Sequence, residues 1–159
     1  MRRVIWPLLC AVASLSFAQI NPPPTVKAKA DKLTVAPGGV VKTTLQVTFA
    51  PDFHAYQNPP SDKFQIPVEV RKPAAPFKLA KVTYPKGVLK VVAGSDQPSG
   101  VYEGLTELPI ELTAPAKPGK YKVKLVVAYQ QCNEENCYPP SQVEVVVDVT
   151  VATKAKKPK

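Results

Sequence analysis

Two cysteines, Cys132 and Cys137, stand five positions apart, and a thiol pair at this spacing can form and break a disulfide. They lie in the run YQQCNEENCYPP over residues 129–140. A disulfide that closes so small a ring stabilises a fold by about 2 kcal/mol, against about 4.7 kcal/mol for a 100-residue loop. Such a bridge contributes little to the stability of the fold. It is accessible, however, and accessible disulfides tend to exchange with thiols. From the residues alone, a redox pair and a purely structural bridge are equally open.

The N-terminal segment 1–18 has the features of a secretory signal peptide. Two arginines precede an apolar run from Val4 to Phe17, and Ser16 and Ala18 occupy the positions that a signal peptidase reads. We expect cleavage after Ala18 and a periplasmic or otherwise extracytoplasmic mature chain, in an oxidising compartment where the cysteines pair. A membrane anchor is disfavoured because the apolar run falls short of about 20 residues.

Composition and charge exclude several classes of function. The chain has 159 residues, 45% hydrophobic and 21% charged, the balance of one globular domain, and its 19 prolines leave little room for long helices. The net charge of +9 does not indicate nucleic-acid binding, because lysines such as Lys120, Lys122 and Lys124 alternate with apolar residues as on a solvated strand face. No cofactor is expected, and zinc is disfavoured because the two cysteines of the mature chain and the lone His54 do not supply four ligands.

Alternation of apolar residues with a period of two predicts about eight strands separated by turn residues. The predicted strands are Val26–Val35, Val40–Phe49, Phe64–Val70, Phe77–Tyr84, Val88–Val92, Val101–Leu112, Tyr121–Tyr129 and Gln142–Val151. The sixth is expected to break at Pro109. This pattern predicts an all-β, immunoglobulin-like antiparallel β-sandwich over residues 26–152, with a proline-rich linker over 19–25 and a basic disordered tail over 153–159. A closed β-barrel is the structural alternative.

The cysteine run resembles the signature of a known family, the N-terminal periplasmic domain of the thiol:disulfide interchange protein DsbD. In that family Tyr-Gln-x-Cys is followed after four or five residues by Cys-x-Pro-Pro. Two further segments are similar to family segments in the same order. The first is Phe53–Tyr56, and the second is Val101–Gly104 followed by Leu108–Ile110. The resemblance covers roughly Val26–Val151. It implies an immunoglobulin-like fold with the redox pair near one end of the sandwich.

The resemblance also implies an activity. The family's domain receives reducing equivalents from a membrane partner and passes them to periplasmic proteins of thioredoxin fold. Cys132 and Cys137 are then the redox pair, with Cys137 forming the mixed disulfide and Cys132 resolving it. Family proteins continue into a membrane domain and a thioredoxin domain, whereas this sequence ends before either. We therefore expect its membrane thiol reductase, of DsbD or CcdA type, on another chain; the alternative is a domain that has left the electron relay.

Five residues are expected to surround the pair: His54, Tyr56, Tyr129, Tyr138 and Asp96. The first two fall where the family has aromatic residues beside the cysteines, although a packed structural histidine is the alternative for His54. Tyr56 and Tyr129 could line the pocket or belong to the core. Asp96 is the one acidic residue of the loop Ala93–Gly100, which falls where the family has a cap over the pair, and no acid–base role is assigned to it.

Glu134 and Glu135, between the cysteines, disfavour a nearby thiolate. This indicates a pair that reacts when a partner brings its own activated cysteine; the glutamates could also contact a basic partner or only solvate the hairpin tip. The alternative function is a binding or scaffold module whose disulfide is structural. A third interpretation, an accessory to cytochrome or metal-centre assembly, differs from the redox shuttle only in its client.

Overall fold

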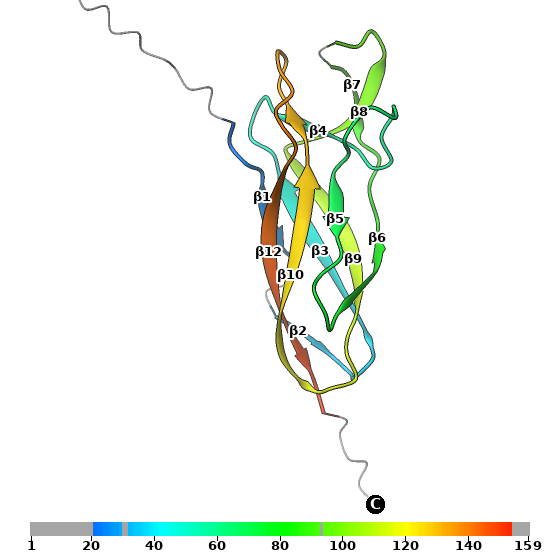
Figure 1. The fold of residues 1–159 in the computed structure, drawn as a ribbon, viewed down its shortest axis with the longest axis vertical. Coiled ribbons are helices and arrows are strands. Elements are labelled where there is room, and N and C mark those ends of the chain that lie inside the picture. Colours follow the sequence, from blue (N-terminus) through cyan, green and yellow to red (C-terminus); the bar gives the residue numbers. More distant parts are fainter. Residues whose placement is uncertain (1–20, 30–31, 93, 154–159) are drawn as a thin grey trace, which may run out of the picture.

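The computed structural model describes residues 21–29, 32–92 and 94–153. The expected signal peptide and nearly all of the expected basic tail lie outside these described residues. Strands and their connections make up the described chain (Figure 1). Within these ranges no helix has the length and apolarity that a membrane crossing requires.

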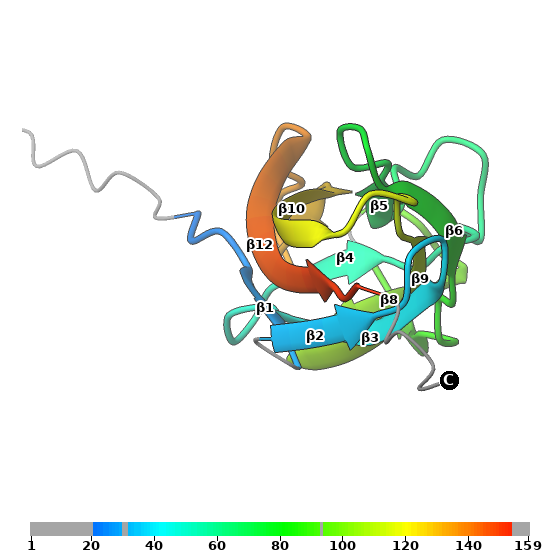
Figure 2. The ribbon, with the colours of Figure 1, turned by 90° about the horizontal axis from the view of Figure 1, so that it is seen from below.

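Two four-stranded sheets pack face to face. The first has the order β1–β3–β9–β6, with β1 (Thr25–Ala28), β3 (Val40–Thr48), β9 (Leu105–Thr113) and β6 (Lys78–Val82). The second has the order β2–β12–β10–β5, with β2 (Lys32–Val35), β12 (Ser141–Val151), β10 (Gly119–Tyr129) and β5 (Glu69–Arg71). Among these strands only β2 and β12 pair in parallel, and Figure 2 shows β10 and β12 opposite β3. The predicted immunoglobulin-like antiparallel sandwich is confirmed, and each sheet keeps two edge strands, so the barrel does not form.

Alternate apolar residues of both sheets fill the space between them. The most buried of these include Leu45, Val47, Leu108, Ile110, Leu112, Leu125, Val127 and Val147. On the outer face, Lys122 pairs with Asp148 at 3.0 Å and Lys124 with Glu144 at 2.9 Å. Exposed ion pairs of this kind contribute at most about 1 kcal/mol each, so burial of the apolar face holds the sandwich together.

The N-terminal segment forms two strands, whereas the sequence predicted one strand over Val26–Val35. β1 pairs with β3 in the first sheet and β2 pairs with β12 in the second. The partly buried apolar residues are Val26 and Ala28 in β1 but Leu33 and Val35 in β2. These positions differ in parity, so a single strand would turn half of them toward solvent. Changing sheets keeps both halves facing the core.

The predicted strand Val101–Leu112 breaks at Gly104, and the prediction of a break at Pro109 is wrong. Gly104 has φ +53°, a conformation that glycine adopts without a steric penalty. It separates β8 (Pro98–Glu103) from β9. Pro109 stays inside β9, and its carbonyl accepts a hydrogen bond from the Thr83 amide at 2.8 Å.

Two further boundaries differ from the prediction. The strand predicted over Phe64–Val70 shrinks to β5, because Pro67 cannot donate to a ladder, and Phe64 lies in a loop. The loop predicted over Ala93–Gly100 is shorter, since β8 already begins at Pro98.

A third sheet closes one end of the sandwich, where Figure 1 also shows the tip that joins β10 to β12. Its order is β11–β4–β8–β7, with β11 (Gln131–Cys132), β4 (His54–Tyr56), β8 and β7 (Val88–Val91). Ala55 and Tyr102 of this sheet belong to the main core. A separate small apolar cluster contains Tyr56, Val92, Val101 and Cys132. The third sheet therefore fixes one cysteine at the end of the sandwich.

Candidate redox site

The cysteine hairpin extends the strand pair β10–β12. Cys132 pairs with His54 of β4 on one side and faces Cys137 on the other. The two cysteines form a disulfide with their Cα atoms 4.0 Å apart. One step closer to the sandwich, the Tyr138 amide donates to the Gln131 carbonyl at 3.0 Å, so the two arms of the hairpin are also paired below the disulfide.

Asn133 organises the turn between the cysteines. Its amide donates to the Asn136 carbonyl at 2.9 Å. Its side-chain Oδ1 accepts hydrogen bonds from the amides of Glu135, at 3.0 Å, and Asn136, at 2.7 Å. An Asn side chain that bonds the backbone two and three positions on stabilises a tight turn. These backbone contacts therefore help to hold the two cysteines close together.

The two cysteines differ sharply in access to solvent. Cys132 is 1% exposed and packs in the small apolar cluster. Cys137 is exposed and lines an open hollow of about 680 Å³. Thiol–disulfide exchange requires a thiolate to reach one sulfur of the bridge. In this structure Cys137, and not Cys132, is open to an incoming thiolate.

Tyr56 is the phenol next to the accessible sulfur. Its side chain is buried, and its hydroxyl lies 4.0 Å from Sγ of Cys137. Burial raises the pKa of Tyr56 above its ordinary value, so the phenol stays protonated at neutral pH. A protonated phenol at this place can donate to a thiolate on Cys137 after the bridge opens.

His54 lies two positions before Tyr56 on β4 of the third sheet. Its ring is 1% exposed and meets Tyr56 edge-to-face with centroids 6.4 Å apart. Neither ring nitrogen has a hydrogen-bond partner among the described residues. Burial, and then the positive charge of Lys90, lower the pKa of His54, with partial opposition from Glu103. The ring is therefore neutral at pH 7, so His54 acts as a packed side chain and not as a positive charge beside the cysteines.

The free energy of unfolding is expected to fall with pH below about 6.5, at up to about 1.4 kcal/mol per pH unit. His54 has a lowered pKa when folded, so the unfolded chain takes up a proton first and gains stability as pH drops. The contribution of His54 to stability is complete above the pKa of the unfolded chain, and it is lost as the pH falls from that value to the lower pKa of the folded state. Urea unfolding between about pH 5.5 and 8 measures this slope.

His54 is the only histidine of the chain, so His54→Phe is a direct control. We expect this variant to flatten the profile over the same pH range. A slope that persists in the variant would assign the dependence to other groups.

The remaining predicted residues divide into two groups. Tyr138 lies beside the hairpin, with its ring 5.9 Å from that of Phe53. Tyr129 points into the main core, where it packs edge-on against Phe49 at 6.5 Å. Asp96 is exposed on the turn between β7 and β8 and is not among the residues that line the hollow. The structure thus gathers His54, Tyr56 and Tyr138 near the cysteines and leaves Tyr129 and Asp96 apart.

Two loops complete the hollow beside Cys137. One is the turn between β7 and β8, which contributes Gly94, Ser95 and Gln97 from the segment predicted as a cap. The other is the loop 57–67, which the sequence reasoning missed because it assigned Phe64 to a strand. The run NPPSD over residues 58–62, rich in turn-forming residue types, is the signal that could have identified it.

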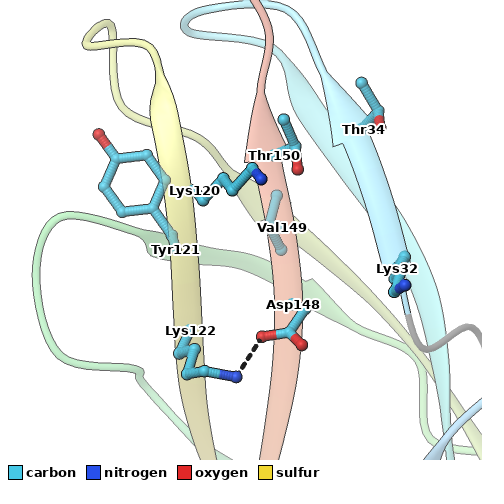
Figure 3. A pocket seen from close by; sticks show the side chains of 8 residues that line it. All are labelled: Lys32, Thr34, Lys120, Tyr121, Lys122, Asp148, Val149 and Thr150. Carbon is cyan, nitrogen blue, oxygen red and sulfur yellow. Dashed lines mark hydrogen bonds and ion pairs between the residues drawn. The ribbon is translucent and has the colours of Figure 1, made fainter.

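A second hollow, of about 610 Å³, lies at the other end of β10 (Figure 3). Lys32, Lys120 and Lys122 line it, and Lys122 is bound to Asp148 at 3.0 Å. None of the described residues around it is a cysteine or histidine. Its residues therefore offer no thiol chemistry, and the hollow at Cys137 is the candidate site.

The comparisons with known proteins agree with this geometry. The model of the family described as "Thiol:disulfide interchange protein DsbD, N-terminal" matches residues 22–149. The chain therefore belongs to this family of thiol:disulfide exchange domains, and the resemblance of the cysteine run is confirmed. In their family context these domains are extracytoplasmic.

The other two comparisons add little about function. No curated protein matches the chain. Among solved structures, the chain is similar to the ASH/PapD-like domain of human CEP192 (PapD-like domain 7). The identity is 16% and the TM-score 0.39, over 92% of this chain and 99% of that chain.

Proposed function

We propose that this domain carries two electrons between a membrane thiol reductase and extracytoplasmic proteins of thioredoxin fold. It does so by cycling Cys132 and Cys137 between disulfide and dithiol. The observation that carries the proposal is the unequal access of the two sulfurs, one exposed in a hollow and the other buried. The proposal places the mature domain at residues 26–152, after a signal peptide at 1–18.

In the reductive half of the cycle, a thiolate of the reductase attacks Sγ of Cys137. The bond between Cys137 and Cys132 breaks, a mixed disulfide forms, and Cys132 leaves as a thiolate that takes a proton from water. A second thiolate of the reductase then attacks its own sulfur in the mixed disulfide and releases Cys137. The reductase gains a disulfide and loses two electrons, and the domain becomes a dithiol.

In the oxidative half, Cys137 attacks the disulfide of a client. One client sulfur leaves, and the other is held in a mixed disulfide with Cys137. Cys132 then attacks Cys137, re-forms the bridge and releases the client as a dithiol. Because the turn around Asn133 keeps the two cysteines close, this resolving step is intramolecular and needs little rearrangement.

The surroundings of the pair slow its reaction with random thiols. The apolar cluster disfavours a thiolate on Cys132, because a charge in a low-dielectric environment loses its hydration. Glu134 and Glu135 are exposed beside the pair and add negative charge. The protonated phenol of Tyr56 offers the accessible sulfur a donor. We infer that the domain waits for a partner that supplies an activated thiolate.

The reduction potential of the pair is expected between roughly −180 and −270 mV, the range of exchanging disulfides. The mature protein would be equilibrated in defined thiol buffers, and free thiols counted by alkylation and mass spectrometry. A potential below about −300 mV would mark a structural disulfide and contradict the proposal. The fold would then serve as a binding or scaffold module.

A further inference from the structure

Folding separates the charges of this chain. We define the redox end as residues 50–66, 88–104 and 130–140, which form the third sheet, the cysteine hairpin and their loops. It carries six acidic and two basic residues, a net charge of −4. The other described residues carry thirteen basic and five acidic residues, a net charge of +8. The accessible cysteine therefore sits at the negative end of a positively charged domain.

Three carboxylates of the redox end lie on the hollow or on the hairpin that holds the accessible sulfur. Asp62 lines the hollow with Cys137, and Glu134 and Glu135 are exposed at the hairpin tip. One of the two lysines is already matched, because Nζ of Lys90 binds the Glu103 carboxylate at 2.6 Å. The other, Lys63, follows Asp62 in the sequence and holds its Nζ 4.9 Å from the centre of the Phe64 ring, so it offsets part of the charge. An incoming group near Cys137 still meets a net negative field, because six acidic residues outnumber these two lysines.

An apolar anchor stands beside this acidic rim. Phe64 lines the same hollow, and its ring is 82% exposed, the highest value among the exposed large apolar side chains. The loop that carries it is fixed to β8, since Gln65 donates to the Ser99 hydroxyl at 2.7 Å and the Gly100 amide donates to the Ser61 hydroxyl at 2.9 Å. Because the loop is already ordered, covering the Phe64 ring with a partner costs little conformational entropy.

We infer that the redox end docks, through Phe64 and the acidic rim of Asp62, Glu134 and Glu135, thiol proteins that carry lysine or arginine beside their reactive cysteine. The inference rests on the proposed function and adds the chemistry of the partner. Reactive thiolates occur next to basic side chains, which stabilise them. The acidic rim attracts such a surface, repels small anionic thiols and repels the redox end of a second copy.

Three synthetic heptapeptides with one cysteine each test the inference. The first carries three lysines and three leucines, the second replaces its lysines with glutamates, and the third replaces its leucines with glycines. The rate of opening of the Cys132–Cys137 bridge would be followed and corrected for the thiolate fraction of each peptide. At low ionic strength we expect the lysine–leucine peptide to react at least about 10-fold faster than the glutamate peptide. At 0.5 M salt the ratio is expected to fall below about 3.

Matched variants separate the two parts of the surface. Replacing Glu134, Glu135 and Asp62 with their amides is expected to bring the lysine-to-glutamate ratio below about 3 at low salt. The control E144Q/D148N removes two carboxylates of the sandwich body and is expected to keep the ratio.

Phe64→Ala is expected to remove the advantage of the leucine peptide over the glycine peptide, which we expect to be about 3- to 10-fold in the unmodified domain. The control is Val146→Ala, which removes a side chain on β12 that is 49% exposed. It is expected to keep that advantage.

The outcomes distinguish the inference from the proposed function. If the bridge opens with all three peptides at equal rates, the docking inference is overturned while the redox function stands. If the control variants lose selectivity as much as the test variants do, the assignment to the redox end is overturned. If no peptide opens the bridge, both the redox function and the docking inference fail.

Discussion

Alkylation of the single-cysteine variants is expected to be at least about 100-fold faster at Cys137, in Cys132→Ser, than at Cys132, in Cys137→Ser. Cys137 is exposed, so its thiol reacts from the folded state. Cys132 is 1% exposed and packs against Tyr56, Val92 and Val101. Reagent reaches it only after a local opening, and an opening free energy of about 3 kcal/mol suppresses the rate about 100-fold.

The measurement is the rate of reaction with a neutral alkylating reagent at several pH values, so that thiolate fraction and access are separated. In concentrated urea the two variants should react at similar rates, because both thiols are then exposed. Comparable rates in the folded state would remove the basis for assigning Cys137 as the attacked sulfur. A faster reaction at Cys132 would reverse the two roles in the proposed cycle.

The parts of the fold that the sequence predicted well are those with a long, regular apolar pattern. β3, β10 and β12 keep their alternation over nine residues or more, and their predicted bounds lie within two residues of the observed ones. The cysteine hairpin was also placed correctly between the two longest strands. In these segments the local pattern and the buried face of the sandwich demand the same register.

The short strands were harder, because tertiary contacts and not periodicity decide them. β4 has three residues, all buried, so it shows no alternation from which a strand could be read. It becomes a strand because β8 and β11 flank it in the third sheet. The break at Gly104 depends on a positive φ, and a sequence offers equal reason to suspect the nearby Pro109.

The residue types predicted a thiol pair, whereas the different roles of Cys132 and Cys137 were implied by the family resemblance alone. The residue types identified the cysteine pair, and the family resemblance added the aromatic segment over Phe53–Tyr56. They could not show that Cys132 is buried and Cys137 exposed, because the two sit in symmetric positions of one hairpin. Nor could they show that dispersed charges would gather by sign. Lysines alternate along the strands, while the acidic residues of three separate segments of the chain converge at one end only when the chain folds.

This division of the molecule implies that stability and redox chemistry can be changed separately. The ring closed by Cys132 and Cys137 is small, so reducing it is expected to cost only about 2 kcal/mol of unfolding free energy. Leu108, by contrast, is 0% exposed at the centre of the main core, on β9. Its side chain does not belong to the apolar cluster around the cysteine.

Leu108→Ala is therefore expected to lower the free energy of unfolding by about 2–5 kcal/mol while leaving the reduction potential of the pair within about 10 mV of the original value. The stability is lost for two reasons: the removed carbon atoms no longer contribute their transfer free energy from water to the core, and a cavity is left between the sheets. Urea unfolding and thiol-buffer titration measure the two quantities on the same samples. The exposed Val146→Ala serves as the control and should change the unfolding free energy by about 0.5 kcal/mol or less. The reduction potential reports the free-energy difference between the dithiol and the disulfide in the folded state. A shift of the potential by much more than about 10 mV in a variant that is still folded would therefore show that the core and the redox end are energetically coupled.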